Sequence, residues 1–160
     1  METTGSHDAI ATLLYTYAER LDAGDLDGVA RLFAHADYGM AAGPLSTGAA
    51  AVRAALEVVR LHDGSPRTHH VTSNLVVDVD ETAGTAGARS YFTVLQATAV
   101  LPLQVVIAGR YHDRFERVDG VWRFRERLIH VDLVGELCEH LRGGLPGAGG
   151  PGVGSSGGAR

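Results

Sequence analysis

The chain has 160 residues, of which 45% are hydrophobic and 21% are charged, and its net charge is -5. This length favours one globular domain with a substantial core. The acidic balance argues against nucleic-acid binding, which needs a basic face to neutralise phosphates. Cys138 is the only cysteine, which excludes an internal disulfide and a multi-cysteine metal site. Neither a signal-peptide pattern nor an apolar run of the ~20 residues that span a bilayer is present, so we expect a cytoplasmic protein without membrane contact.

Helical periodicity marks the N-terminal part of the chain. A first helix is predicted to begin near Ser6, because the following apolar residues recur at the spacing of one helix face. These residues are Ile10, Leu13, Leu14, Tyr17 and Leu21. Asp25 is placed to cap a second helix, a short strand is predicted near residues 37–41, and Thr47 opens a third helix.

Period-two alternation then predicts four strands, at residues 68–80, 88–101, 103–117 and 121–132. The last two strands are joined at Asp119-Gly120, a strong hairpin signal because the turn needs positive φ and glycine adopts it without strain. Residues 133–141 are predicted to form a short helical cover. Residues 143–160 are rich in Gly, Pro and Ser and are predicted to form a disordered tail.

Three helices followed by a meander of strands predict an α+β fold. We expect residues 1–142 to form a cone-shaped α+β barrel, with the helices packed on one face of a curved antiparallel sheet that encloses a pocket. Cavities of this kind are sites for small ligands.

Strand alternation also assigns side chains to the two faces of the predicted sheet. His70 shares a face with Thr72 and Asn74, whereas His69 lies on the opposite face. Only one of the two histidines can therefore point at the helices, and periodicity does not decide which. Tyr111 alternates in step with apolar neighbours on its strand, which favours an inward position.

The last predicted strand places His130 on the same face as Trp122 and Phe124, near the base of the pocket. Arginines alternate along the same strands and predict a charged sheet surface that faces solvent or another subunit. These arginines are Arg89, Arg110, Arg114, Arg123, Arg125 and Arg127.

The stretch 110–124 resembles the late sheet of the nuclear transport factor 2 superfamily, specifically its SnoaL-like branch, and the resemblance extends over residues 6–141. The segment 21–27, Leu-Asp-Ala-Gly-Asp-Leu-Asp, resembles the acidic helix-to-helix segment of scytalone dehydratase and of hexachlorocyclohexane dehydrochlorinase. The segment 67–74, Arg-Thr-His-His-Val-Thr-Ser-Asn, resembles the strand that carries their catalytic histidine. The resemblance implies that Asp22 orients His70, and that His70 removes a proton from carbon.

This chemistry is physically sound, because a carboxylate bonded to one imidazole nitrogen fixes the tautomer and raises the basicity of the other nitrogen. Proton removal from carbon begins eliminations, isomerisations and aldol-type cyclisations, and it needs neither a cofactor nor a metal. We therefore expect a cofactor-independent lyase or isomerase, of dehydratase or cyclase type, that acts on a small apolar oxygenated ring compound such as a polyketide intermediate. The predicted catalytic residues are His70 and Asp22, and the predicted substrate-binding residues are Tyr17, Tyr111, Asn74, Trp122 and His130.

The sequence departs from the two enzymes at several positions. Scytalone dehydratase has a second histidine where this chain has Leu95, and a pocket asparagine where it has Tyr111. Leu21 replaces the tyrosine before the aspartate, and the lysine on which the dehydrochlorinase relies has no counterpart, since the chain has no lysine.

Two alternatives therefore remain open beside a lyase or isomerase. One is a non-catalytic ligand-binding or assembly subunit, like the small subunit of ring-hydroxylating dioxygenases. The other is an epoxide hydrolase, whose Asp-Arg-Asp arrangement is not found at matching positions. A homodimer or homotrimer is expected in each case.

Overall fold

The structure is a computed structural model that describes residues 5–145. Its helices are α1 (Ser6–Asp22), α2 (Leu26–Leu32) and α3 (Gly48–Ala55), and the 3₁₀ turn η1 (Leu56–Val58) follows α3. Its strands are β1 (Asp37–Met40), β2 (Ser46–Thr47), β3 (Thr68–Asp80), β4 (Thr85–Gln96), β5 (Gln104–Val118) and β6 (Val121–Val134). Most of the predicted disordered tail, residues 146–160, lies outside the described residues.

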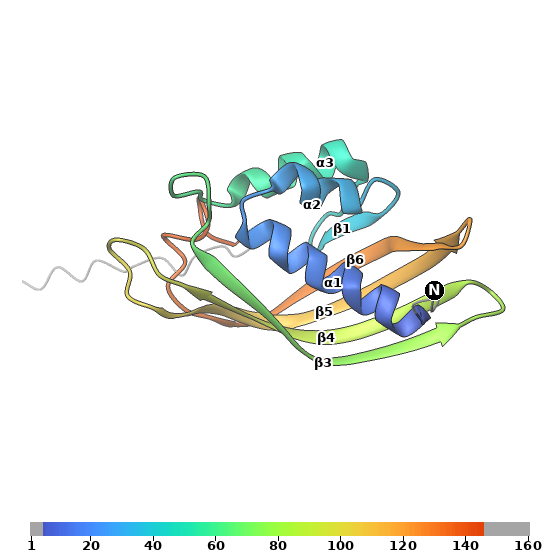
Figure 1. The fold of residues 1–160 in the computed structure, drawn as a ribbon. Helices are drawn as coiled ribbons and strands as arrows, with labels where there is room; N and C mark the ends of the chain where they lie inside the picture. The colour runs from blue at the N-terminus through green and yellow to red at the C-terminus, as the bar shows by residue number, and fades with distance from the viewer. Residues whose placement is uncertain (1–4, 146–160) are drawn as a thin grey trace, which may run out of the picture.

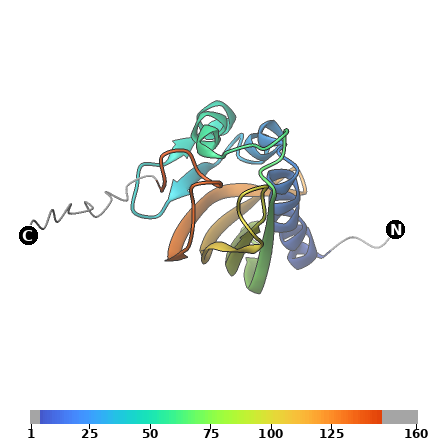
Figure 2. The same ribbon diagram turned by 90° about the vertical axis from the view of Figure 1, so that its left-hand side faces the viewer.

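The six strands form one sheet in the order β2-β1-β6-β5-β4-β3. All neighbouring pairs are antiparallel except β1 and β6, which run parallel. The helices lie together on one face of the sheet, with α1 running over the long strands (Figure 1). Seen along the sheet, the strands curve beneath the helices (Figure 2). The predicted α+β architecture, with three helices on a curved and mostly antiparallel sheet, is confirmed.

The core lies between the helices and the concave face of the sheet. Side chains of α1 and α2 such as Leu14 and Val29 are fully or almost fully buried, and they meet Phe115 and Phe124 of the sheet. Burial of a large apolar side chain stabilises the fold by about 1.5–3 kcal/mol, so this layer fixes the position of α1 above the strands. The end of α1 is thereby held beside the first residues of β3. None of the helices in residues 5–145 has the length and apolarity needed to cross a membrane.

Local signals in the sequence account for the element boundaries. The Asp25 side chain caps α2 by accepting a hydrogen bond from the Gly28 backbone N–H at 2.8 Å. The hairpin between β5 and β6 turns through Asp119 and Gly120, whose φ angles are 51° and 81°, as the turn type requires. Both predictions are confirmed.

The predicted helical cover at residues 133–141 is wrong. Strand β6 continues to Val134, and the Gly135 N–H then donates to the Val106 carbonyl at 2.8 Å. The chain crosses the end of the barrel as turns, where Leu141 pairs with Val59. One local turn remains, in which the Leu137 carbonyl accepts the N–H groups of His140 and Leu141, and the other backbone bonds run to neighbouring segments.

Two of the β-bulges in the sheet change which side chains of β3 and β6 face the helices. On β3, Asn74 and Leu75 lie opposite a single residue of β4, and Asn74 has a φ of 52°. On β6, Arg125 is the extra residue against β5. Because a bulge shifts the alternation by one position, the inward face changes parity beyond each bulge.

Candidate active site

A carboxylate and an imidazole meet where α1 ends and β3 begins. The Asp22 Oδ1 atom lies 2.5 Å from the His70 Nδ1 atom. The other carboxylate oxygen accepts the His70 backbone N–H at 2.8 Å, and the Thr68 hydroxyl donates to Oδ1 at 2.7 Å. The Asp22 carboxylate thus holds both the ring and the backbone of His70, which fixes the ring orientation.

The surroundings of Asp22 keep its carboxyl ionised. Partial burial acts to raise its pKa, but the hydrogen bonds and charge of His70, together with the Thr68 hydroxyl, outweigh burial and lower the pKa below its usual range. The ionised Asp22 carboxylate favours the tautomer of the His70 ring that carries its hydrogen on Nδ1. The lone pair of the His70 ring is then on Nε2.

A cavity of about 600 Å³ opens beside the His70 ring. His70 lines it, whereas Asp22 lies behind the histidine and is not a lining residue. The hydrogen bond that the resemblance implies between Asp22 and His70 is present, and of the two residues only His70 reaches the cavity. Most of the wall is apolar, with lining residues that include Leu21, Leu56, Phe92, Val94, Ile107 and Ile129.

Three tyrosines from three elements line the same cavity. Tyr17 comes from α1, Tyr38 from β1 and Tyr111 from β5, and all three line it. The hydroxyls of Tyr17 and Tyr38 are 3.0 Å apart and share a hydrogen bond. Burial, together with the neighbouring Tyr17, raises the pKa of Tyr38 and of Tyr111 well above the usual range, so both are neutral hydrogen-bond donors.

A second histidine, His140, lines the cavity from the segment that follows β6. Its side chain is buried, and its ring centre is 6.4 Å from that of His70. Burial and the nearby His70 lower the pKa of His140 to about 4, although Asp22 opposes this shift. His140 is therefore neutral near pH 7. Sequence analysis missed it, because no periodic pattern placed the segment over the cavity.

A completely buried ion pair lies beneath the tyrosines. The Arg127 guanidinium donates to both oxygens of Asp113, each at 2.8 Å, and neither side chain is exposed to solvent. Its Cζ atom lies 4.2 Å from the centre of the Tyr17 ring and 4.0 Å from that of Tyr111. Neither charged residue lines the cavity. The expected outward position of Arg127 is wrong, because the bulge at Arg125 turns the residue inward.

Tyr17 and Tyr111 are predicted substrate-binding residues that the structure places in the cavity wall. The other three predicted substrate-binding residues, Asn74, Trp122 and His130, do not line the cavity. Asn74 is exposed at the β3 bulge, and Trp122 packs in the core near Arg117. His130 falls beyond the β6 bulge and packs against His112 in a tilted arrangement, with ring centres 4.4 Å apart, on the opposite face of the sheet from the cavity. Strand alternation could not place Asn74 and His130, because it assumes an unbroken period of two. Trp122 precedes the β6 bulge and faces inward as alternation predicts, but it is not a lining residue of the cavity.

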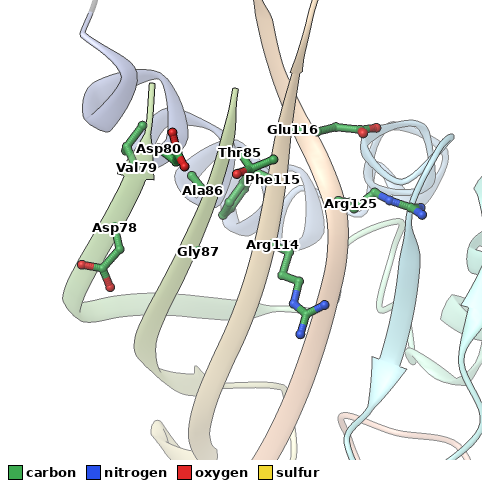
Figure 3. Close-up of a pocket in the computed structure, with 10 residues that line it drawn as sticks. All are labelled: Asp78, Val79, Asp80, Thr85, Ala86, Gly87, Arg114, Phe115, Glu116 and Arg125. Carbon is green, nitrogen blue, oxygen red and sulfur yellow. The ribbon is translucent and has the colours of Figure 1, made fainter. Parts of the chain in front are cut away.

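An open groove lies at the far end of β3 from His70 and crosses β4 and β5. Its charged side chains include Asp78, Arg114 and Glu116, and they point in different directions instead of converging on one position (Figure 3). The groove therefore lacks the cluster of groups that a reaction would need. In residues 5–145 we find no cluster of three or more His, Cys, Asp or Glu side chains arranged to hold a metal ion.

A family model for the SnoaL-like domain matches residues 2–128. The chain belongs to the SnoaL-like family. Its fold is the nuclear transport factor 2-like, cystatin-like fold, which a solved chain from Novosphingobium aromaticivorans shares at 19% identity. No match was found among curated proteins.

Solved structures with higher identity align over most of this SnoaL-like chain. A variant of a Mycobacterium tuberculosis protein of unknown function is 28% identical, with a TM-score of 0.64 over 79% of this chain and 76% of its own. A Novosphingobium aromaticivorans protein provisionally assigned as a scytalone dehydratase is 25% identical, with a TM-score of 0.65 over 79% and 84%. The protein Aln2 from a Streptomyces species is 25% identical, with a TM-score of 0.67 over 82% and 94%.

Proposed function

We propose that this SnoaL-like protein is a cofactor-independent lyase or isomerase that uses His70 as a base to remove a proton from carbon. The observation that carries the proposal is the 2.5 Å contact between His70 Nδ1 and Asp22, with the ring of His70 in the wall of an apolar cavity. Similarity to a provisionally assigned scytalone dehydratase agrees with a dehydratase or cyclase type of reaction.

The lining of the cavity supports a neutral ring compound as the substrate. No arginine, aspartate or glutamate is among the lining residues within 5–145, so the cavity offers no counter-charge for a phosphate or carboxylate. Apolar walls suit a ring, and the hydroxyls of Tyr17, Tyr38 and Tyr111 suit a carbonyl or hydroxyl oxygen. The substrate is a small, neutral, oxygenated ring compound such as a polyketide intermediate.

The reaction begins with transfer of a proton from a carbon beside a carbonyl group to Nε2 of His70. The electron pair of the broken C–H bond moves toward the carbonyl oxygen and forms an enolate, and a tyrosine hydroxyl stabilises the negative charge on that oxygen. Asp22 stabilises the imidazolium formed at His70. Return of the proton to another carbon gives isomerisation, whereas its return to a departing hydroxyl group gives loss of water.

Deuterium exchange tests this proposal without knowledge of the natural substrate. The probe is 2-tetralone, a bicyclic ketone whose hydrogens beside the carbonyl exchange with D₂O when a base removes them, and NMR measures the rate. The wild-type protein should accelerate exchange above buffer, and His70→Gln should lose about 10²- to 10⁴-fold of that acceleration.

The matched control is His69→Gln, which changes the adjacent and exposed histidine and should keep the wild-type rate. Equal rates for His70→Gln and the wild type would overturn the base assignment. If 2-tetralone binds but the wild type gives no acceleration, the alternative of a non-catalytic ligand-binding module gains support.

A further inference from the structure

We propose that His140 is a second catalytic residue, which donates a hydrogen bond to a substrate oxygen while His70 takes the proton from a nearby carbon. This inference rests on the proposed function and adds a group that the family resemblance does not supply. It assigns a role to the segment 137–142, which crosses the open end of the barrel.

Backbone bonds fix the position of His140. Its carbonyl oxygen accepts the Arg60 N–H at 2.9 Å, and its own N–H donates to the Leu137 carbonyl at 2.9 Å. Arg142 N–H donates to the Val58 carbonyl at 2.7 Å, and the Glu139 carbonyl accepts the Gln96 side-chain amide at 2.9 Å. A segment bonded to other parts of the chain at three points places the ring with the precision that a catalytic group needs.

The ring itself has hydrogen-bonding capacity left for a ligand. His140 is 6% exposed, and its Nδ1 atom is buried without a hydrogen-bond partner among the described residues. Buried polar atoms are nearly always bonded, so an unpartnered imidazole nitrogen beside a cavity calls for an explanation. Because Nδ1 is enclosed by the protein, we assign the donated N–H to Nε2.

The two histidines divide the chemistry between them. His70 holds the Asp22 carboxylate at 2.5 Å, while His140 has no carboxylate in hydrogen-bond contact among residues 5–145. The charged and titratable groups around His140 are His70 and Asp22 in front, and Glu139 and His62 beside it. With its low pKa, His140 stays uncharged and offers one N–H, as a neutral imidazole does when it polarises a carbonyl group.

A matched pair of probes separates a hydrogen bond from packing. The probe 2-tetralone carries one carbonyl oxygen, and tetralin has the same ring system without it. Calorimetry on the full chain should show that His140→Phe weakens 2-tetralone binding about tenfold or more, because the ring is kept but the donor is lost. His140→Gln retains a donor and should stay within about threefold of the wild type. Tetralin should bind all three proteins equally.

The same variants should differ in deuterium exchange. His140→Phe should lower the rate about 10²-fold, as loss of a donor to a developing oxyanion does, and His140→Gln should retain most of the rate. Thermal unfolding of each variant checks that the fold persists, and His69→Gln serves as the control. Unchanged 2-tetralone binding and exchange in His140→Phe would overturn the inference, as would equal weakening of tetralin binding.

The outcomes also separate this inference from the proposed function. If carbonyl-dependent binding through His140 is found but the wild type gives no exchange, the hydrogen bond stands and the base assignment of His70 fails. If His70 is needed for exchange but His140→Phe is unaffected, the base assignment stands and the inference about His140 fails.

Discussion

The aspartates Asp113 and Asp22 are each bonded to a basic side chain, but their surroundings differ. Asp113 and Arg127 are both completely buried and bonded through two contacts of 2.8 Å. Asp22 and His70 share one contact of 2.5 Å, and the ring of His70 lines the cavity. Arginine does not release its proton in proteins, whereas imidazole gains and loses one near neutral pH. The first pair can therefore only hold the structure, and the second can carry out proton transfer.

The pKa directions of the two aspartates agree with this division. Complete burial raises the pKa of Asp113, against the charge and hydrogen bonds of Arg127, whereas His70 outweighs burial and lowers the pKa of Asp22. Arg127 also packs against the rings of Tyr17 and Tyr111, which line the cavity. The buried pair thus supports the tyrosine wall, whereas Asp22 and His70 are the pair that we propose to react.

The largest expected effect is on stability and comes from breaking the buried pair. Arg127→Met leaves the Asp113 carboxylate buried without a partner, which should lower the free energy of unfolding by about 3–5 kcal/mol. Urea denaturation measures the loss. The matched control is Arg110→Met. Arg110 is an exposed arginine that also makes two bonds to an aspartate, Asp132, so its loss should change the urea midpoint little.

The double variant Asp113→Val with Arg127→Met sharpens the comparison, because an apolar pair of similar volume removes both buried charges together. It should be more stable than Arg127→Met alone. A double variant less stable than that single variant would show that the pair is needed for more than charge compensation.

The second effect is on rate and comes from the cavity pair. Asp22→Asn keeps the shape of the side chain but removes the charge that stabilises a protonated His70. We expect deuterium exchange of 2-tetralone to slow about 10²-fold or more, with little change in its binding. Asp27→Asn, which alters an exposed aspartate on α2, should keep the wild-type rate. A weakened affinity with an unchanged rate would instead assign Asp22 to ligand binding.

The smallest effect is the pH dependence of stability. The pKa of Asp22 is lowered in the folded state, so the stability it contributes is present above the pKa of the unfolded carboxyl. That stability is lost as the pH falls through the lower folded value. Urea midpoints at pH 6 and pH 3 should therefore differ less for Asp22→Asn than for the wild type. An identical fall in both proteins would mean that His70 does not favour the ionised carboxylate.

Sequence reasoning succeeded where the signal was local or was carried by a family motif. Asp119-Gly120 marked the hairpin through its turn chemistry, and the segments around Asp22 and His70 marked the pair through resemblance. It failed at the β-bulges, where one extra residue reverses the inward face. For that reason Arg127 lies inside and His130 outside, contrary to expectation.

The position of His140 could not be predicted for a different reason. Its segment is held by hydrogen bonds to residues far away in sequence, such as Arg60 and Gln96, and no repeating pattern in residues 137–142 records those contacts. Tertiary contacts, and not local propensity, decide the course of such a segment.

The central claim is that Asp22 holds His70 as a base with a free Nε2 facing the cavity, and the nitrogen NMR spectrum of the His70 ring tests it most directly. Near neutral pH, the neutral form of the ring should carry its hydrogen on Nδ1, in a strong hydrogen bond to Asp22, and Nε2 should give the signal of an unprotonated nitrogen. Asp22→Asn should remove the strong hydrogen bond. A neutral ring with its hydrogen on Nε2 would contradict the account, because no lone pair would then face the substrate.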